Sequence, residues 1–329
     1  MTRASGIGSW PGRSVREAVV TVRDLLLDGD GLGLPYLPET PARGPGADLI
    51  GRGAGLLADL AVDLQPSGWR FVDRPGHDAS RTAGFLREEL DEAAEAYDGY
   101  AGPLKIQVAG PWTLLASIEL NRGERAVTDP GAAREVCASL AEGIRRHVAD
   151  LARLVPGASI TVQLDEPSLP AVLAGDLPTA SGYGRARAVD PQVVARGLSE
   201  VLAGCPGGTV IHCCHPMAPL PLLRSTGVGA LAIDLTDASP ARWESVAATL
   251  ETGVELYAGC LPTEGDGTVA SAVRLVTDGF ERAGLVAADL SRVTVTPTCG
   301  LAGSSVAGAR EIQRTALAVA SELSERQGA

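Results

Sequence analysis

The sequence predicts an α/β protein that forms one closed, parallel (β/α)8 barrel, or TIM barrel, with an extended connection after the second strand. Two observations predict this fold. Short β-like runs alternate with longer stretches whose apolar residues recur at three- and four-residue spacing, as one-sided helices require. The 329 residues provide eight such strand–helix pairs, and the length suits a single barrel. Neither a repeat nor a low-complexity linker divides the chain, so we expect residues 1–329 to form a single domain.

The expected strands and helices follow one another in order along the chain. The strands are expected at Gly6–Trp10, Gly31–Leu37, Leu104–Val108, Ser159–Leu164, Thr209–Cys213, Ala230–Leu235, Glu255–Gly259 and Arg292–Thr296. The helices are expected at Val15–Leu27, Ala47–Leu64, Thr82–Tyr97, Ala132–Leu154, Gln192–Leu202, Arg242–Leu250, Val269–Ala283 and Val306–Leu323. Residues 38–103 are more than one connection needs, so an additional hairpin or helix is expected near Trp69–Asp73.

The overall charge excludes some classes of partner. A formal net charge of -12 argues against nucleic acid and against an anionic membrane surface. The N-terminal residues lack a signal-peptide core, and no run of ~18 apolar residues follows, so we expect a cytoplasmic protein without a membrane span. Lys105 is the only lysine beside many arginines, which we interpret as a bias in base composition rather than a functional feature.

Residues capable of chemistry collect at the predicted strand ends. In (β/α)8 barrels the active site lies at the C-terminal ends of the strands, because the loops that follow the strands gather there. The clustering therefore indicates that the cysteines among them are functional. The residues at these ends are Ser9, Trp10, Tyr36, Glu39, Asp165, Glu166, His212, Cys214, Asp234, Cys260 and Cys299.

The fifth predicted strand ends in the unusual run His212-Cys213-Cys214-His215. In an extended strand the side chains at positions i and i+2 point to the same face. His212 and Cys214 therefore point together, and Cys213 points away from them. A histidine nitrogen and a cysteine sulfur on one face supply half of a tetrahedral zinc site.

Two further residues are candidates to complete that zinc site. Cys299 follows the last predicted strand, and Asp234 ends the sixth strand and could supply an oxygen ligand. Asp234 could instead hold His212 in one tautomer from outside the metal shell. The alternative to a metal site is a set of buried thiols with a core histidine. We expect that structural role for Cys137 and Cys205, and Cys260 is also more typical of a core residue.

These motifs resemble the catalytic barrel of the cobalamin-independent methionine synthase family. The metal motifs are His212-x-Cys214, an acid at the end of the next strand, and the Cys299-Gly-Leu turn. The resemblance spans nearly the whole chain, but it matches only the C-terminal catalytic barrel of the full-length enzymes. Three further segments carry it: Ile7–Pro11, Gln163–Ser168 and Gly110–Thr113, the last also seen in the related uroporphyrinogen decarboxylase-like barrels.

The resemblance implies a zinc-dependent methyltransferase of methionine biosynthesis that methylates homocysteine. By that resemblance the ligands of Zn²⁺ are His212, Cys214 and Cys299, with Asp234 where the family usually has a glutamate. The chemistry fits, because free thiols with a pKa near ~8.5 are largely protonated at neutral pH, whereas a thiol bound to zinc is deprotonated. Two thiolates and a carboxylate would make the zinc electron-rich and keep the substrate sulfur nucleophilic.

The amino-acid part of homocysteine would be bound by Ser9 and Asp165. Strand alternation allows only one of Asp165 and Glu166 to face the barrel mouth, and the family motif selects Asp165 as the catalytic carboxylate that pairs with the substrate ammonium. Glu166 stays a second substrate-binding candidate. The structural alternative is a carboxylate that caps the following helix, with Pro167 at its first position.

Two departures from the family bear on the methyl donor. The chain lacks the additional N-terminal barrel that helps to hold the folate, and residues 256–264 lack the histidine that the family carries there. A methyl-carrying corrinoid protein is therefore an alternative to a folate donor. Two other functions remain open: a uroporphyrinogen decarboxylase-like lyase, against which the His-x-Cys motif counts, and a non-catalytic zinc- or thiol-binding barrel.

Overall fold

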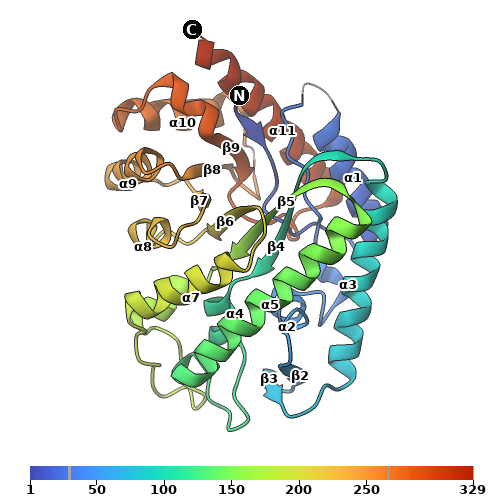
Figure 1. Cartoon of the computed structure of the whole chain (residues 1–329). Helices are drawn as coiled ribbons and strands as arrows, with labels where there is room; N and C mark the ends of the chain where they lie inside the picture. Colours follow the sequence, from blue (N-terminus) through green and yellow to red (C-terminus); the bar gives the residue numbers. More distant parts are fainter. Residues whose placement is uncertain (29–30, 266, 329) are drawn as a thin grey trace.

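A curled parallel sheet forms the centre of the molecule, and helices surround it (Figure 1). The computed structural model describes residues 1–28, 31–265 and 267–328. Within these residues the sheet has seven strands, all paired in parallel. Their spatial order is β1 (Arg3–Ala4), β9 (Val293–Pro297), β8 (Glu255–Leu261), β7 (Ala230–Asp234), β6 (Gly208–Cys213), β5 (Gly157–Asp165) and β4 (Ala101–Ala109).

The helices around the sheet form a closed ring. Each helix of the ring contacts the next one along the chain, and the last contacts the first. The two described ends of the chain therefore lie near each other, at the top of Figure 1. The ring consists of α1 (Val15–Leu27), α3 (His77–Ala96), α5 (Pro130–Leu154), α7 (Pro191–Ala203), α8 (Leu220–Arg224), α9 (Pro240–Glu251), α10 (Val269–Arg282) and α11 (Val306–Glu325).

Residues 32–39 lie between β1 and β4, where the second strand was predicted. The predicted strand Gly31–Leu37 is wrong as a regular strand, because the segment pairs only through isolated bridges. Pro35 and Pro38 explain this, since proline has no N–H to continue a ladder. The predicted strand Gly6–Trp10 is corrected in the same way: the paired residues are Arg3–Ala4. The bridges join Ala4 to Gly33, Ser9 to Glu39 and Tyr36 to Lys105. A closed eight-stranded barrel is compatible with this arrangement.

The long connection before β4 contains the additional hairpin expected near Trp69–Asp73. Strands β2 (Ala61–Gln65) and β3 (Gly68–Val72) pair antiparallel, which confirms that expectation. The predicted helix Ala47–Leu64 is wrong in its second half, because α2 (Leu49–Ala54) ends before β2 begins. Three glycines within 51–55 weaken this helix, and Asp59 leaves helical geometry with a φ of 61°.

Between the main elements lie short helical segments that the periodicity did not indicate. They are too short to show an apolar repeat, and their positions depend on contacts with neighbouring strands and loops. These segments are α4 (Pro111–Ser117), α6 (Leu169–Ala174) and the 3₁₀ turns η1 (Pro41–Arg43), η2 (Ala126–Thr128), η3 (Ala287–Arg292) and η4 (Arg326–Gly328).

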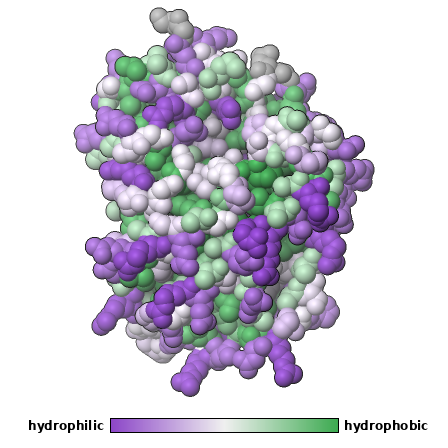
Figure 2. Space-filling view, in the orientation of Figure 1, coloured by the Kyte–Doolittle hydropathy of each residue, from purple (hydrophilic) through white to green (hydrophobic). Residues whose placement is uncertain are grey.

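Polar and apolar residues are divided between the surface and the core. Figure 2 shows hydrophilic side chains over much of one face, with hydrophobic residues between them. In the described ranges, no helix has the length and apolar character that crossing a bilayer requires. Cys137, Cys205 and Cys260 are buried in the main hydrophobic core, which confirms their expected structural role.

Candidate functional site

The residues predicted to bind a metal from β6 and β9 lie together. His212 is near the end of β6, Cys214 follows β6 directly, and Cys299 comes two residues after β9. One donor atom from each of these residues lies within 4.8 Å of the other two. Because parallel strands end at the same edge of a sheet, residues far apart in the sequence meet here.

The ring of His212 is oriented by Asp165, its register partner on β5. Nδ1 of His212 lies 2.8 Å from Oδ1 of Asp165, and since the carboxylate accepts, Nδ1 carries the proton. In the neutral imidazole, Nε2 then has a free lone pair. This atom is buried and has no hydrogen-bond partner among the described residues. A buried, unpartnered nitrogen beside two thiols is the donor set that suits zinc.

The two thiols of the group interact directly. Sγ of Cys214 and Sγ of Cys299 lie 3.5 Å apart, within hydrogen-bonding distance for sulfur. Sharing a proton with Cys214 lowers the pKa of Cys299 to about 6, and the pKa of Cys214 rises. Cys213 behaves differently, because it is buried in the main core and burial raises its pKa to about 12. Adjacent cysteines thus have opposite environments, as the alternation of the strand predicts.

Asp234 is not part of this three-residue group. It ends β7, and its Oδ1 accepts hydrogen bonds from the backbone N–H of Thr236 at 2.8 Å and from the Thr236 hydroxyl at 2.6 Å. Its role as a fourth ligand stays a prediction. The carboxylate that contacts His212 is Asp165, so Asp165 has the orienting position that the sequence left open for Asp234.

Among the described residues, hydrogen bonds reach one oxygen of Asp165 and not the other. Oδ1 accepts from Nδ1 of His212 and from Nε2 of Gln163, at 2.8 and 2.7 Å. Oδ2 accepts no hydrogen bond from the described residues and is not among the buried, unpartnered atoms. Asp165 thus holds the histidine with one oxygen and keeps the other available.

Glu166 points elsewhere, under the N-terminus of α4. Its carboxylate accepts from the backbone N–H of Trp112 at 3.0 Å and from the N–H and hydroxyl of Thr113, both at 2.8 Å. A Cβ on Gly110 would lie 2.4 Å from this carboxylate, so glycine is required there. Burial raises the pKa of Glu166 to about 7, although these hydrogen bonds lower it. These contacts account for the Gly110–Thr113 motif and for the burial of Glu166 without a substrate.

Ser9 packs against the turn that carries Cys299. The carbonyl of Ser9 accepts from the N–H of Leu301 at 2.9 Å, and its hydroxyl lies 3.4 Å from the N–H of Ala302. A Cβ on Gly300 would lie 2.1 Å from the Ser9 hydroxyl. Gly8-Ser9 and Cys299-Gly300 therefore pack against each other beside the metal group.

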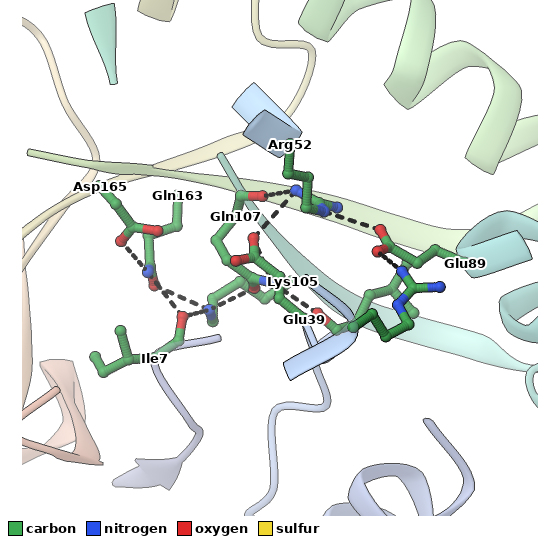
Figure 3. A network of polar contacts seen from close by, with 10 residues as sticks. Ile7, Glu39, Arg52, Glu89, Lys105, Gln107, Gln163 and Asp165 are labelled. Carbon is green, nitrogen blue, oxygen red and sulfur yellow. Dashed lines mark hydrogen bonds and ion pairs between the residues drawn. The ribbon is translucent and has the colours of Figure 1, made fainter. Parts of the chain in front are cut away.

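Sequence reasoning missed the buried polar residues below this group. Figure 3 shows them as a connected network that reaches from Asp165 to Glu89 on α3. Lys105 and Gln107 on β4 and Gln163 on β5 are each at most 1% exposed. The available signal was polar residues at alternate positions, 105 and 107 on one strand and 163 and 165 on the next, where a barrel interior is expected to be apolar.

A known protein family matches nearly the whole chain. Residues 1–322 match the family model described as the catalytic domain of cobalamin-independent synthase. No curated protein matches the chain.

Two solved structures match the chain with different degrees of similarity. A B12-independent methionine synthase from Shewanella sp. W3-18-1, in complex with selenomethionine, is 12% identical with a TM-score of 0.66, over 99% of this chain and 98% of that chain. A putative dihydrodipicolinate synthetase from Pseudomonas aeruginosa is 10% identical with a TM-score of 0.45, over 100% of this chain and 80% of that chain. The family match covers nearly the whole sequence, so the chain belongs to the family of cobalamin-independent synthase catalytic domains, which supports a methyltransferase role.

Proposed function

We propose that this protein is a zinc-dependent methyltransferase that methylates homocysteine to give methionine, on a (β/α)8 barrel whose second strand is the segment 32–39. The observation that carries the proposal is the meeting of His212, Cys214 and Cys299, with a buried imidazole nitrogen that has no partner in the described part of the chain. Three protein donors leave one tetrahedral position free, which is the arrangement of catalytic zinc sites.

The donor set suits a reaction at sulfur. A zinc ion held by one imidazole and two thiolates would keep a coordinated substrate thiol deprotonated at neutral pH, which supplies the nucleophile. Asp165 keeps the His212 ring in the tautomer that presents Nε2 to the metal. In the transfer, the sulfur forms a bond to the methyl carbon while the bond between that carbon and its donor breaks.

The substrate's amino-acid group would lie beside the metal group. Oδ2 of Asp165 is the free carboxylate oxygen there, and it would accept from the ammonium in a charge-assisted hydrogen bond. Ser9 is close to the Cys299 turn and would bind the carboxylate or the ammonium. Glu166, with three internal donors, would support the site by holding α4 rather than by touching substrate.

The methyl donor is a separate question. The family is described as cobalamin-independent, which favours a folate over a corrinoid protein. We propose methyltetrahydrofolate as the donor and expect a direct assay with homocysteine to decide between it and a methylcorrinoid.

Adjacent cysteines provide the test. Protein purified without added zinc is expected to contain about one metal ion per chain. Cys214→Ser should lose the metal and the methyl transfer, whereas Cys213→Ser, which changes the neighbouring core cysteine, should keep both. Metal analysis and the methylation of homocysteine give the two readouts.

Each outcome has a definite meaning. Near-stoichiometric metal in a variant that carries both Cys214→Ser and Cys299→Ser would defeat the metal centre. Zinc and homocysteine binding without turnover from any donor would instead identify a non-catalytic zinc- and thiol-binding barrel.

A further inference from the structure

Buried polar side chains form a hydrogen-bonded chain that leads inward from Asp165 (Figure 3). It begins at Asp165, whose Oδ1 accepts from both His212 and Gln163. Gln163 is 0% exposed, and its Nε2 also donates to the carbonyl oxygen of Ile7 at 2.8 Å. Its Oε1 accepts from Nζ of Lys105 at 2.9 Å. The histidine is thus connected to Lys105 through two intervening side chains.

These contacts permit only one orientation of the Gln163 amide. A flipped amide would bring its NH₂ group against the ammonium of Lys105. It would also bring its carbonyl oxygen against two acceptors, Ile7 O and the carboxylate of Asp165. Lys105 and Ile7 therefore select the orientation in which Gln163 donates to Asp165.

The side chain of Lys105 is also held in one position by its hydrogen bonds. It is 0% exposed, and an ammonium has three protons to donate. Three acceptors receive them: Ile7 O at 2.8 Å, Gln163 Oε1 at 2.9 Å and Gln107 Oε1 at 3.3 Å. Burial lowers the pKa of Lys105 to about 7, although the charges of Asp165 and Glu39 raise it. A buried cation is costly, so its presence below the metal group indicates a role beyond filling space.

The network has a second branch that mirrors the first. Gln107 is the register partner of Gln163 and also accepts from Lys105. Its Nε2 donates to the carbonyl of Leu37 at 2.7 Å and to Oε1 of Glu39 at 3.3 Å. Glu39 pairs with Arg52 of α2. The two glutamines thus have the same kinds of contact, but only the branch of Gln163 leads to His212.

We propose that Lys105 and Gln163 are positioning residues for the metal centre. Lys105 fixes the amide of Gln163, and Gln163 fixes the carboxylate of Asp165 that orients the ring of His212. The inference rests on the metal centre of the proposed function and deepens it, because it names the groups that set the position of a ligand from inside the barrel.

The two glutamines form a matched pair for the experiment. Gln163→Met and Gln107→Met each remove a buried amide that accepts from Lys105 and donates to one carbonyl and one carboxylate. The full chain is made metal-free and titrated with Zn²⁺ against a chelator, and Co²⁺ is added in parallel to record its absorption bands. No thiol substrate is present.

Gln163→Met is expected to weaken Zn²⁺ binding by about 10-fold and to alter the Co²⁺ bands. This is the lower end of the about 10- to 100-fold loss that follows removal of a direct partner of a ligand, because Gln163 acts on His212 through Asp165. Gln107→Met should stay within about threefold of the wild type, although both variants lose similar stability in the metal-free state. If Gln163→Met does not fold, Gln163→Glu keeps the length of the side chain and its contact with Lys105. It places an oxygen against Asp165 and should weaken binding in the same way, with Gln107→Glu as its control.

Equal Zn²⁺ affinities in the two variants of either pair would overturn the inference. If the wild type binds the metal and the Gln163 and Gln107 variants have equal Zn²⁺ affinities, only the positioning role fails. If the wild type binds neither Zn²⁺ nor Co²⁺, the proposed function fails together with the inference.

Discussion

Two parts of the inner face of the curled sheet differ in chemistry. On β4 and β5 the inward positions next to the site carry Lys105, Gln107, Gln163 and Asp165, all of them buried. Further along the sheet, β6, β7 and β8 contribute to an apolar cluster. That cluster consists of Ile7, Leu34, Val210, Ala230, Ala232 and Tyr257. His212 lies between the two regions, as it follows Val210 on the same face of β6 and is the register partner of Asp165.

The difference teaches how one fold can both be stable and hold a reactive site. Apolar residues pack without directional demands, so the β6–β8 side stabilises the fold by burial. On the β4–β5 side, Lys105, Gln107 and Gln163 are tied by hydrogen bonds that fix their orientation. Such a network costs stability if any member is lost, but it specifies positions sharply. The following predictions test this contrast.

The largest effect is expected for Lys105→Met on the polar side. The variant leaves three buried acceptors without their donor and removes the buried amine whose charge interacts with Asp165 and Glu39. We expect the free energy of unfolding to fall by about 3 kcal/mol or more. Urea denaturation of the metal-free protein measures this free energy. A decrease of less than about 1 kcal/mol would contradict the expectation that breaking the network is costly.

A smaller loss is expected on the apolar side, for Val210→Ala. Two methyl groups leave a packed region, which should cost about 2 kcal/mol of unfolding free energy. Zn²⁺ affinity should stay within about threefold of the wild type, because no hydrogen bond of the network changes. A tenfold drop in affinity would show that apolar packing also positions His212, and the contrast between the two sides would not hold.

The third prediction concerns the pH dependence of stability. The ordinary pKa of lysine is 10.5, and that of Lys105 in the folded protein is lowered to about 7, first by burial. Between these values the unfolded chain binds a proton that the folded chain does not. The contribution of Lys105 to the free energy of unfolding therefore rises with pH from about 7 towards 10.5, by at most about 1.4 kcal/mol per pH unit.

The single lysine makes this prediction directly measurable. Protein labelled with ¹³C-lysine gives one Cε resonance, whose midpoint of titration is expected near pH 7. Lys105→Met should lack the corresponding rise of stability above pH 7. A midpoint above pH 10 would mean that the hydrogen bonds to the ammonium raise the pKa of Lys105 as much as burial lowers it.

The smallest effect is expected for Asp234→Asn at the end of β7. Since Thr236 satisfies Oδ1 of Asp234, the substitution should change Zn²⁺ affinity by less than about threefold. The chelator titration used for the glutamine pair checks this. If Asp234→Asn lowers the Zn²⁺ affinity as much as Cys214→Ser does, Asp234 is the fourth ligand, as the resemblance to the family implied.

Local patterns predicted the long helices and the strands from β4 onwards well. Helices such as α5 and α10 were expected within a few residues of their observed limits, because amphipathic periodicity is a property of the segment itself. The first two strands were misplaced, since whether residues 6–10 and 31–37 pair depends on proline positions and on partners far away in the sequence. The end of α2 was missed for a similar reason, because β2 exists only by pairing with β3.

The sequence by itself determined the residues of the candidate metal group, because strand alternation separates Cys214 from Cys213 and the strand ends share one edge of the sheet. Only the tertiary structure decided which carboxylate orients His212. Asp165 ends β5 and Asp234 ends β7, the two strands on either side of β6, and hydrogen-bond geometry alone distinguishes them. It also decided the place of Lys105. In the sequence this residue is one cation among many, and its burial and its three acceptors come from strands and loops that meet only in the folded protein.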